Sequence, residues 1–401
     1  MTGKRELDRR VVVAALGLTQ ILSWGTSFYF PAVFAAPIVA DTGWGLTYVV
    51  SGTSIGLLIA GLLAPQIGKW IDIHGGRPVI LASAPLQAAG LIIMGFAPSL
   101  SVFLVAWVLV GFGMASGTYD AVFAALGRNY GSEARQPITN LTLIGGFAST
   151  VCCPLGAFLV ARLGWRDACF VYAALHIFIT WPLFAAVLRD RARHNAPLVG
   201  EKVDARFVDP APLPNEAVVF VILASVMTII FGVGSVLIVY LLLFLQARGV
   251  DYATAVALGT IYGPSQIAAR IVERMFGGHY HPLWTLVAAV LAMAVGMALL
   301  FTGGVWLALV ILIYAGGFGV SWVARGTVPL ALFGPRRFPR LMGKLALPSL
   351  IAQGVAPSVG AVLIERLGVD TTIGLLTAAL AFNVVLVALL WLACRARLAE
   401  T

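Results

Sequence analysis

The chain has 401 residues, of which 60% are hydrophobic and only 11% are charged. An average soluble domain is about 45–50% apolar and about 25% charged, so this chain has too few charges to cover a soluble surface of its size. The same figures exclude a disordered chain, which needs low hydrophobicity and a high net charge. The composition therefore predicts a protein that crosses a membrane many times.

The formal net charge is +9, which in a soluble protein would suggest a nucleic-acid partner. Here nearly all Lys and Arg residues fall in segments that share one side of the membrane, if both termini are cytoplasmic. The exceptions outside the spans are Arg162, Arg166, Arg248 and Arg366. This asymmetry follows the positive-inside rule, so we predict cytoplasmic termini, contact with the lipid bilayer and no nucleic-acid partner.

The apolar stretches divide into roughly twelve spans, each near the ~20 residues that cross a bilayer. In chain order, spans 1 to 12 are expected at about 11–39, 46–70, 78–96, 99–127, 138–161, 167–188, 216–246, 252–276, 281–302, 305–331, 342–365 and 371–394. The first run is too long for the apolar region of a cleavable signal peptide. We expect an all-α, multi-pass membrane protein.

One long polar stretch, 189–215, separates the spans into two sets of six. We therefore expect an N-terminal six-helix bundle at 1–188, a cytoplasmic linker at 189–215 and a C-terminal six-helix bundle at 216–401. A weak internal repeat supports this division, because 156–164 and 360–368 close spans 5 and 11 with similar sequences. Paired halves of this kind place a transport path between them.

The loop between spans 2 and 3 reads GKWIDIHGGRP at 68–78. It resembles the G-x-x-x-D-x-x-G-x-R signature of the major facilitator superfamily. The resemblance implies two six-helix bundles related by pseudo-two-fold symmetry. It also implies that Asp72 and Arg77 stabilise the cytoplasmically closed state through a charge network with the other half. The motif residues are Gly68, Asp72, Gly75, Gly76 and Arg77.

A looser similarity is to the bacterial monocarboxylate-porter-like branch of that family. It rests on Gly43 and Trp44 after the first helix and on Arg270 in span 8. Relatives often carry an Asp four residues before this arginine, where this chain has Gln266. The resemblance implies a monomer in a bacterial inner membrane.

Four charged residues fall inside spans, where each costs about 2.5–3.5 kcal/mol and usually marks a pathway or an ion pair. They are Asp120, Arg270, Glu273 and Arg325. In one interpretation the two arginines bind an anionic substrate while Asp120 or Glu273 carries a coupling proton. In the other, Asp120 and Arg325 form a gate, and Arg270 pairs with Glu273 one turn away on the same helix.

Uncharged polar side chains in the spans are further candidates, because buried amide and phenol groups need hydrogen-bond partners. We expect some of them to contact substrate and others to bond between helices: Gln20, Tyr29, Tyr119, Gln266 and Gln353. We expect His176 in span 6 to be a packed histidine.

Motifs of nucleotide-binding loops, zinc proteases and nucleophile elbows do not occur. The four cysteines lack metal-ligand spacing. We therefore expect no enzyme activity, no cofactor and no metal. The prediction is a secondary active transporter that moves a small organic anion by alternating access, coupled to a proton or to an exchanged anion. One alternative is an efflux transporter for neutral or cationic drugs or metabolites. Another is a non-transporting receptor or sensor on a transporter scaffold.

Overall fold

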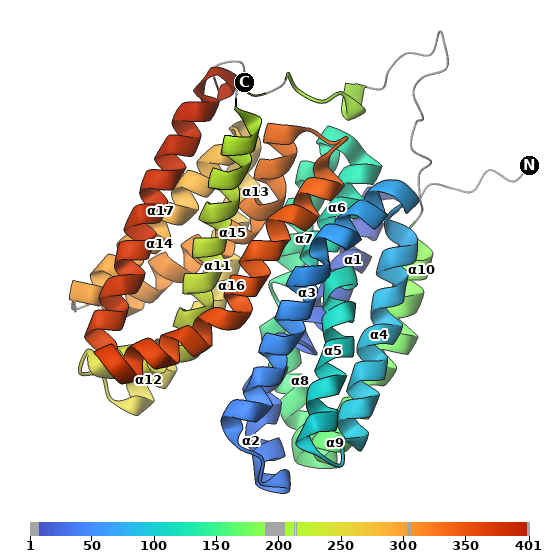
Figure 1. The fold of residues 1–401 in the computed structure, drawn as a ribbon, viewed down its shortest axis with the longest axis vertical. Coiled ribbons are helices and arrows are strands. Elements are labelled where there is room, and N and C mark those ends of the chain that lie inside the picture. Colours follow the sequence, from blue (N-terminus) through green and yellow to red (C-terminus); the bar gives the residue numbers. More distant parts are fainter. Residues whose placement is uncertain (1–7, 189–204, 212, 214, 303–305, 399–401) are drawn as a thin grey trace, which may run out of the picture. The chain divides into compact units, whose positions relative to one another are not determined.

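The computed structural model describes residues 8–188, 205–211, 213, 215–302 and 306–398 (Figure 1). Within these residues the chain forms helices and no strands. It divides into two compact units, which are described separately. Unit 1 comprises Met1–Asp209 and Gly334–Lys344, and unit 2 comprises Pro210–Phe333 and Leu345–Thr401.

Unit 1 contains spans 1 to 6. Its elements are α1 (Arg9–Gly25), α2 (Phe30–Thr42), α3 (Leu46–His74), α4 (Gly76–Phe96), α5 (Leu100–Gly117), α6 (Tyr119–Tyr130), η1 (Gly131–Ala134), α7 (Arg135–Gly145), α8 (Ala148–Leu163), α9 (Trp165–Leu175), η2 (His176–Thr180), α10 (Trp181–Val187) and η3 (Ala205–Phe207). Pairs α4 and α5, α3 and α5, and α1 and α7 pack together.

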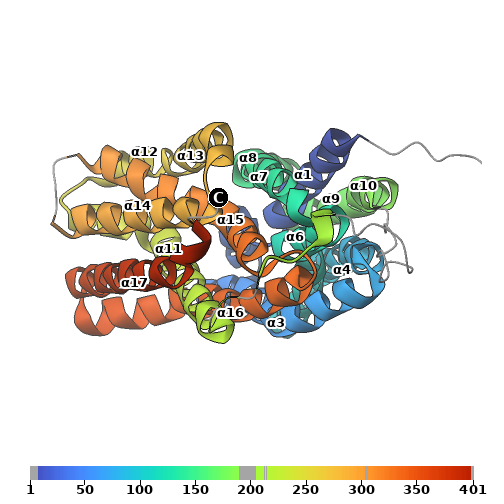
Figure 2. The same cartoon turned by 90° about the horizontal axis from the view of Figure 1, so that it is seen from above.

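Unit 2 contains the remaining spans. Its elements are α11 (Glu216–Ala247), α12 (Tyr252–Gly259), α13 (Tyr262–Phe276), η4 (Gly277–His279), α14 (Pro282–Thr302), α15 (Leu307–Phe333), α16 (Phe338–Leu367) and α17 (Val369–Leu398). Helix α14 packs against both α15 and α17, and Figure 2 shows α14 beside α17. The first residues of α16 belong to unit 1, although the sequence places them in the half expected to form the second bundle.

Ten helical runs of the described chain are long and apolar enough to cross a membrane. One of them, 100–163, contains spans 4 and 5 together, because short breaks at its turns do not interrupt the helical run. Span 8 is not among the ten, and its second part, α13, carries Arg270, Glu273 and Arg274. The chain is thus a multi-pass membrane protein.

Spans 1, 4, 5 and 8 are interrupted helices. Span 1 turns at 26–29, span 4 breaks at Thr118, span 5 at Gly146 and Phe147, and span 8 at Thr260 and Ile261. Glycine precedes several of these breaks and is a poor helix former. At two of them a threonine hydroxyl bonds back to its own helix: Thr26 to Leu22 O (2.9 Å) and Thr118 to Met114 O (2.8 Å). Interrupted helices carry the substrate and ion sites of many transporters.

Candidate functional site

In unit 1, an amide from span 1 reaches the break in span 4. Gln20 is fully buried, and its Nε2 donates to the carbonyl oxygen of Gly117 at 2.8 Å. Gly117 is the last residue of α5, so its carbonyl lacks the usual helical partner. Gln20 Oε1 has no hydrogen-bond partner among the described residues. Gln20 thus forms a hydrogen bond between spans 1 and 4, and its role in substrate binding stays a prediction.

Tyr119 lies directly beside this contact. It opens α6, is only 4% exposed and stacks on Phe123 with ring centroids 5.4 Å apart. Trp24 of α1 packs against it at 5.3 Å. A side chain at Gly145 would overlap the Tyr119 hydroxyl, so this glycine lets spans 4 and 5 approach. The structure thus brings Gln20 and Tyr119 together at one aromatic-walled point in unit 1.

The other two predicted residues of unit 1 flank the same breaks. Tyr29 is half-buried in the turn of span 1, where its ring meets Phe28 edge-on at 5.1 Å. Asp120 is 8% exposed in the first turn of α6. A carboxylate at this position interacts favourably with the positive end of the helix dipole. Its pairing with Arg325, a residue of unit 2, stays a prediction.

In unit 2, Arg270 is tied to the backbone of span 10. Its side chain is buried, and Nε donates to the carbonyl oxygen of Gly319 at 2.9 Å. Its Nη2 lies 3.4 Å from Oε1 of Gln266, one turn earlier on α13. A Cβ at Gly319 would lie 2.6 Å from Gln266 Cα, so only glycine permits this close approach of spans 8 and 10. The Nε bond fixes the plane of the guanidinium, whose remaining donors have directions set by that plane.

Glu273 lies one turn beyond Arg270 and bonds to another helix. It is 8% exposed, and Thr285 Oγ1 of α14 donates to its Oε1 at 2.8 Å. A side chain at Gly277 would overlap the same carboxylate. The hydroxyl of Thr285 can donate to Glu273 in either protonation state, because each state retains an accepting oxygen.

Arg325 of span 10 lies against aromatic rings. Its side chain is 1% exposed, and Cζ is 4.5 Å from the ring centroid of Phe231 and 5.7 Å from that of Trp322. A desolvated cation–π contact is worth about 2 kcal/mol, which offsets part of the cost of burying the charge. Arg270 meets span 10 at Gly319, six residues before Arg325, or about 9 Å along a helix axis.

The remaining predicted residue, Gln353, is 2% exposed, and its backbone carbonyl accepts from Ser235 Oγ at 2.7 Å.

The motif of the loop between spans 2 and 3 meets the start of α16 within unit 1. Asp72 is almost fully buried, and its Oδ2 lies 2.6 Å from Nε of Arg340, whose side chain is 54% exposed. A Cβ at Gly68 would lie 3.1 Å from the backbone of Gly343. Gly75 has a φ of +94°, a backbone conformation in which any side chain would be strained.

The other two motif residues hold unit 1 together. A side chain at Gly76 would overlap Ala125 of α6. Arg77 Nη2 lies 3.5 Å from the carbonyl oxygen of Ala185, at the end of span 6. The motif therefore stabilises the packing of its own helices and the contact with the start of α16.

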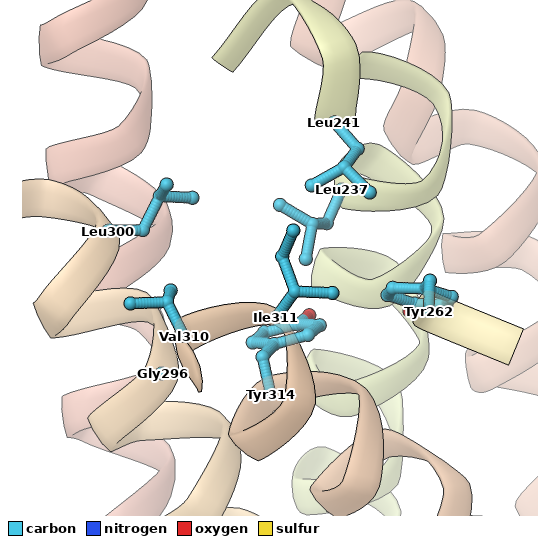
Figure 3. A pocket seen from close by; sticks show the side chains of 8 residues that line it. All are labelled: Leu237, Leu241, Tyr262, Gly296, Leu300, Val310, Ile311 and Tyr314. Carbon is cyan, nitrogen blue, oxygen red and sulfur yellow. The ribbon is translucent and has the colours of Figure 1, made fainter. Parts of the chain in front are cut away.

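One small cavity in unit 2 lies apart from these residues. It measures about 10 Å³ and is lined by Leu237, Leu241, Tyr262, Gly296, Leu300, Val310, Ile311 and Tyr314 (Figure 3). One water molecule needs roughly this space. The cavity is thus too small for an organic substrate. In the described ranges, no three His, Cys, Asp or Glu residues are placed to hold a metal ion.

Sequence reasoning missed several partners of the predicted residues. Phe231 and Trp322 surround Arg325, Gly319 and Thr285 hold the charges of span 8, and Arg340 bonds to Asp72. A signal existed for Trp322, which lies one turn before Arg325 on the same helix. None existed for the others, because their contacts join distant parts of the sequence.

Comparison with known proteins agrees with this architecture. The family model "Major Facilitator Superfamily" matches residues 16–284. Monocarboxylate transporter 3 of Rattus norvegicus is 26% identical over 362 residues, which are 86% of this chain and 72% of the rat protein. Among solved structures, the human organic anion transporter MFSD10 (TETRAN) has a TM-score of 0.74 at 16% identity and covers 95% of this chain and 100% of its own. The proton:xylose symporter XylE has a TM-score of 0.65 at 15% identity, with 94% of each chain covered.

Proposed function

The chain belongs to the major facilitator superfamily, and on that premise we propose that it carries a small organic anion whose charge is bound by Arg270. As a member it is a secondary active transporter of small organic substrates and not an enzyme. The observation that carries the proposal is the buried guanidinium of Arg270, held by its Nε–H···O=C bond to Gly319. The rat relative is by name a monocarboxylate transporter, which supports the same substrate class.

The chemistry of the site suits a carboxylate. A guanidinium has five N–H donors in a planar fork, which binds the two oxygens of a carboxylate together. In the low dielectric of a buried site, this charge-assisted pair is stronger than in water. Gln266 supplies only a neutral oxygen near Nη2. This contact therefore does not neutralise the positive charge of Arg270.

Glu273 is the residue that we propose for proton coupling. It is a nearly buried carboxyl, one turn from Arg270, with a neutral donor from Thr285. Protonation at this position would remove a buried charge close to the substrate's own charge. Exchange of one anion for another is the alternative form of coupling, and it needs no change at Glu273.

Asp120 and Arg325 form the proposed gate, and Asp72 with Arg340 supports the cytoplasmically closed state. We further propose that both termini are cytoplasmic, because the basic residues gather on their side of the spans. A monomer in a bacterial inner membrane completes the proposal. The tilted and stacked rings of Trp24, Tyr119 and Phe123 favour a second candidate, efflux of neutral or cationic aromatic compounds.

The test is transport by the full-length protein in liposomes, with radiolabelled lactate, pyruvate and benzoate as probes. We expect saturable uptake of at least one of them, abolished in Arg270→Ala and not restored in Arg270→Lys, which lacks the fork. The matched control is Arg274→Ala, an exposed arginine one turn further along the same helix. Equal loss in both variants, or uptake of cationic dyes in place of the acids, would overturn the anion proposal.

A further inference from the structure

Span 6 contains a π-helical turn, His176–Thr180, between α9 and α10. Such turns are rare and occur frequently at functional sites. Both His176 and Thr180 are fully buried, and the turn contacts α1 and α4 within unit 1. The transport proposal uses neither residue.

The side chain of His176 reaches the point where span 1 stops being helical. Its Nε2 lies 2.7 Å from Oγ1 of Thr26. The same hydroxyl lies 2.9 Å from the carbonyl oxygen of Leu22. A hydroxyl has a single proton. Because the Thr26 hydroxyl donates its proton to the Leu22 carbonyl oxygen, it can only accept from His176. Nε2 therefore carries the imidazole proton, and Nδ1 is an acceptor.

Three polar atoms of this region have no hydrogen-bond partner among the residues that the structure describes. They are His176 Nδ1, Thr180 Oγ1 and Ser23 Oγ. All three side chains are fully buried. A buried polar atom without a partner costs about 1–3 kcal/mol, so native structures rarely leave one in this state.

The helical register places two of these atoms, Ser23 Oγ and Thr180 Oγ1, at a similar depth. Helix α1 and span 6 run in opposite directions in unit 1 (Figure 1). From the Thr26–His176 contact, three residues back along α1 lead to Ser23, and four residues forward along span 6 lead to Thr180. Both steps run the same way and cover about one helical turn, roughly 5 Å. Ser23 and Thr180 therefore lie at a similar depth, about one helical turn from the contact between His176 and Thr26.

We propose that a water molecule is bound between α1 and the π-turn by His176 Nδ1, Ser23 Oγ and Thr180 Oγ1. A buried water typically makes about three hydrogen bonds to groups that would otherwise lack a partner. It donates to Nδ1 and to one hydroxyl and accepts from the other hydroxyl. Neither α1, η2 nor α4 contains an acidic residue, which disfavours a cation at this place.

The water joins two irregular segments of the fold. Thr26 opens the turn at 26–29, and α2 follows at Phe30. The π-turn of span 6 and the interruption of span 1 thus stabilise each other through one polar seam. This inference does not depend on the substrate, because it concerns the inside of unit 1 and not the charges of span 8.

The experiment compares thermal unfolding of the purified full-length protein with that of Thr180→Val, Ser23→Ala and the double variant. Each single change removes one water contact and should lower the melting temperature by about 2–4 °C. The melting temperature of the double variant should be little lower than that of the less stable single variant, because that single change already releases the water. If the hydroxyls were dry, replacing them with apolar groups would raise the melting temperature, and that sign overturns the proposal.

The matched control is Ser27→Ala. Ser27 is equally buried, but its hydroxyl donates to the backbone carbonyl oxygen of Ser23, one turn earlier, at 2.5 Å. We expect a smaller shift than for Ser23→Ala. An experimental density map that shows ordered water decides the matter if a variant does not fold. A peak within hydrogen-bond distance of His176 Nδ1 supports the site, and well-ordered side chains without such a peak contradict it.

Discussion

In unit 1, three helix ends are joined by an arginine at the beginning of span 6. Arg166 Nη1 donates to the carbonyl oxygens of Gly95 (3.2 Å) and Ala97 (3.0 Å), at the end of α4. Its Nη2 lies 3.5 Å from Oδ2 of Asp41, near the end of α2. Trp165 Nε1 donates to the same carboxylate at 2.9 Å. We call this arrangement the three-helix clamp.

Unit 2 has the same clamp with the charges exchanged. Arg248 follows α11, its Nε donates to the carbonyl oxygen of Leu300 at the end of α14 (2.8 Å), and its Nη1 lies 2.6 Å from Asp370 at the start of α17. The arginine is thus on the first span of the unit and the carboxylate on the last, the reverse of unit 1. Asp41 corresponds to Arg248, and Arg166 corresponds to Asp370. The sequence separation within each of these pairs is nearly equal to the separation between the repeats at 156–164 and 360–368.

The difference shows what the clamp requires. An arginine must reach the carbonyl end of the third span, where a cation stabilises the helix dipole. A carboxylate must then hold that arginine. Either neighbouring helix can supply either charge. A residue-by-residue comparison of the two halves therefore hides a feature that they share.

The largest effect is expected from removing the arginine of each clamp. Arg248 is 13% exposed in its side chain and Arg166 is 40% exposed. Arg248→Ala should lower the free energy of unfolding by about 2 kcal/mol, because it removes a charged hydrogen bond from a partly buried carbonyl. Arg166→Ala should cost less, since water screens an exposed pair. Thermal unfolding in detergent measures both, and a larger loss for Arg166 would contradict the burial argument.

The carboxylates that end spans 2 and 8 offer a second contrast between the units. Asp72 is paired with Arg340, whereas Glu273 accepts from the neutral Thr285. Asp72→Asn should lower the free energy of unfolding by about 1 kcal/mol, because it removes the ion pair of a buried carboxylate. Glu273→Gln keeps the contact with Thr285, since an amide oxygen still accepts from that hydroxyl. Transport that is unchanged in Glu273→Gln would remove this residue from the proposed proton coupling.

A charge exchange would give unit 1 the polarity of unit 2. Asp41→Arg alone places two arginines together and should destabilise unit 1. The double variant Asp41→Arg, Arg166→Asp should recover about 0.5–1 kcal/mol of that loss in a double-mutant cycle. A double variant that unfolds at the temperature expected from simple addition would show that the two helices do not have interchangeable roles.

The smallest effect concerns the cavity that unit 2 contains. Val310 is 4% exposed and lines this space of about 10 Å³. Filling a cavity gains about 24 cal/mol per Å³, so Val310→Ile should stabilise the protein by about 0.2 kcal/mol. The matched variant is Val110→Ile in unit 1. Val110 packs closely against Gly90, so an added methyl group has no space there and should destabilise the protein. Equal shifts in both variants would show that the cavity does not affect packing.

Much of the fold could be predicted from the sequence. The expected ends of span 3 (78–96) and span 9 (281–302) lie within a few residues of α4 and α14. Their apolar runs end at turn residues, so the boundaries are local features. The interruptions of spans 1, 4, 5 and 8 could not be located in the same way. A glycine or threonine in a helix breaks it only where neighbouring helices bond to the freed backbone, as Gln20 does at Gly117.

The candidate site divides along the same line. Arg270, Glu273 and Arg325 stood out because charges are rare in apolar spans. Their partners Gly319, Thr285 and Phe231 did not, since glycine, threonine and phenylalanine are common there. The sequence identified the costly groups but not what compensates them.

By itself, the sequence determined that this protein lies in a membrane, roughly where each span begins and ends, and the family to which it belongs. These follow from solvent transfer and from short motifs, which are properties of neighbouring residues. Only the tertiary structure decided that Asp72 bonds to Arg340, that Arg270 bonds to Gly319 and that the arginine and the carboxylate of the two clamps lie on exchanged spans. Each joins residues from different helices, and a side chain's partner across helices depends on how those helices pack and rotate.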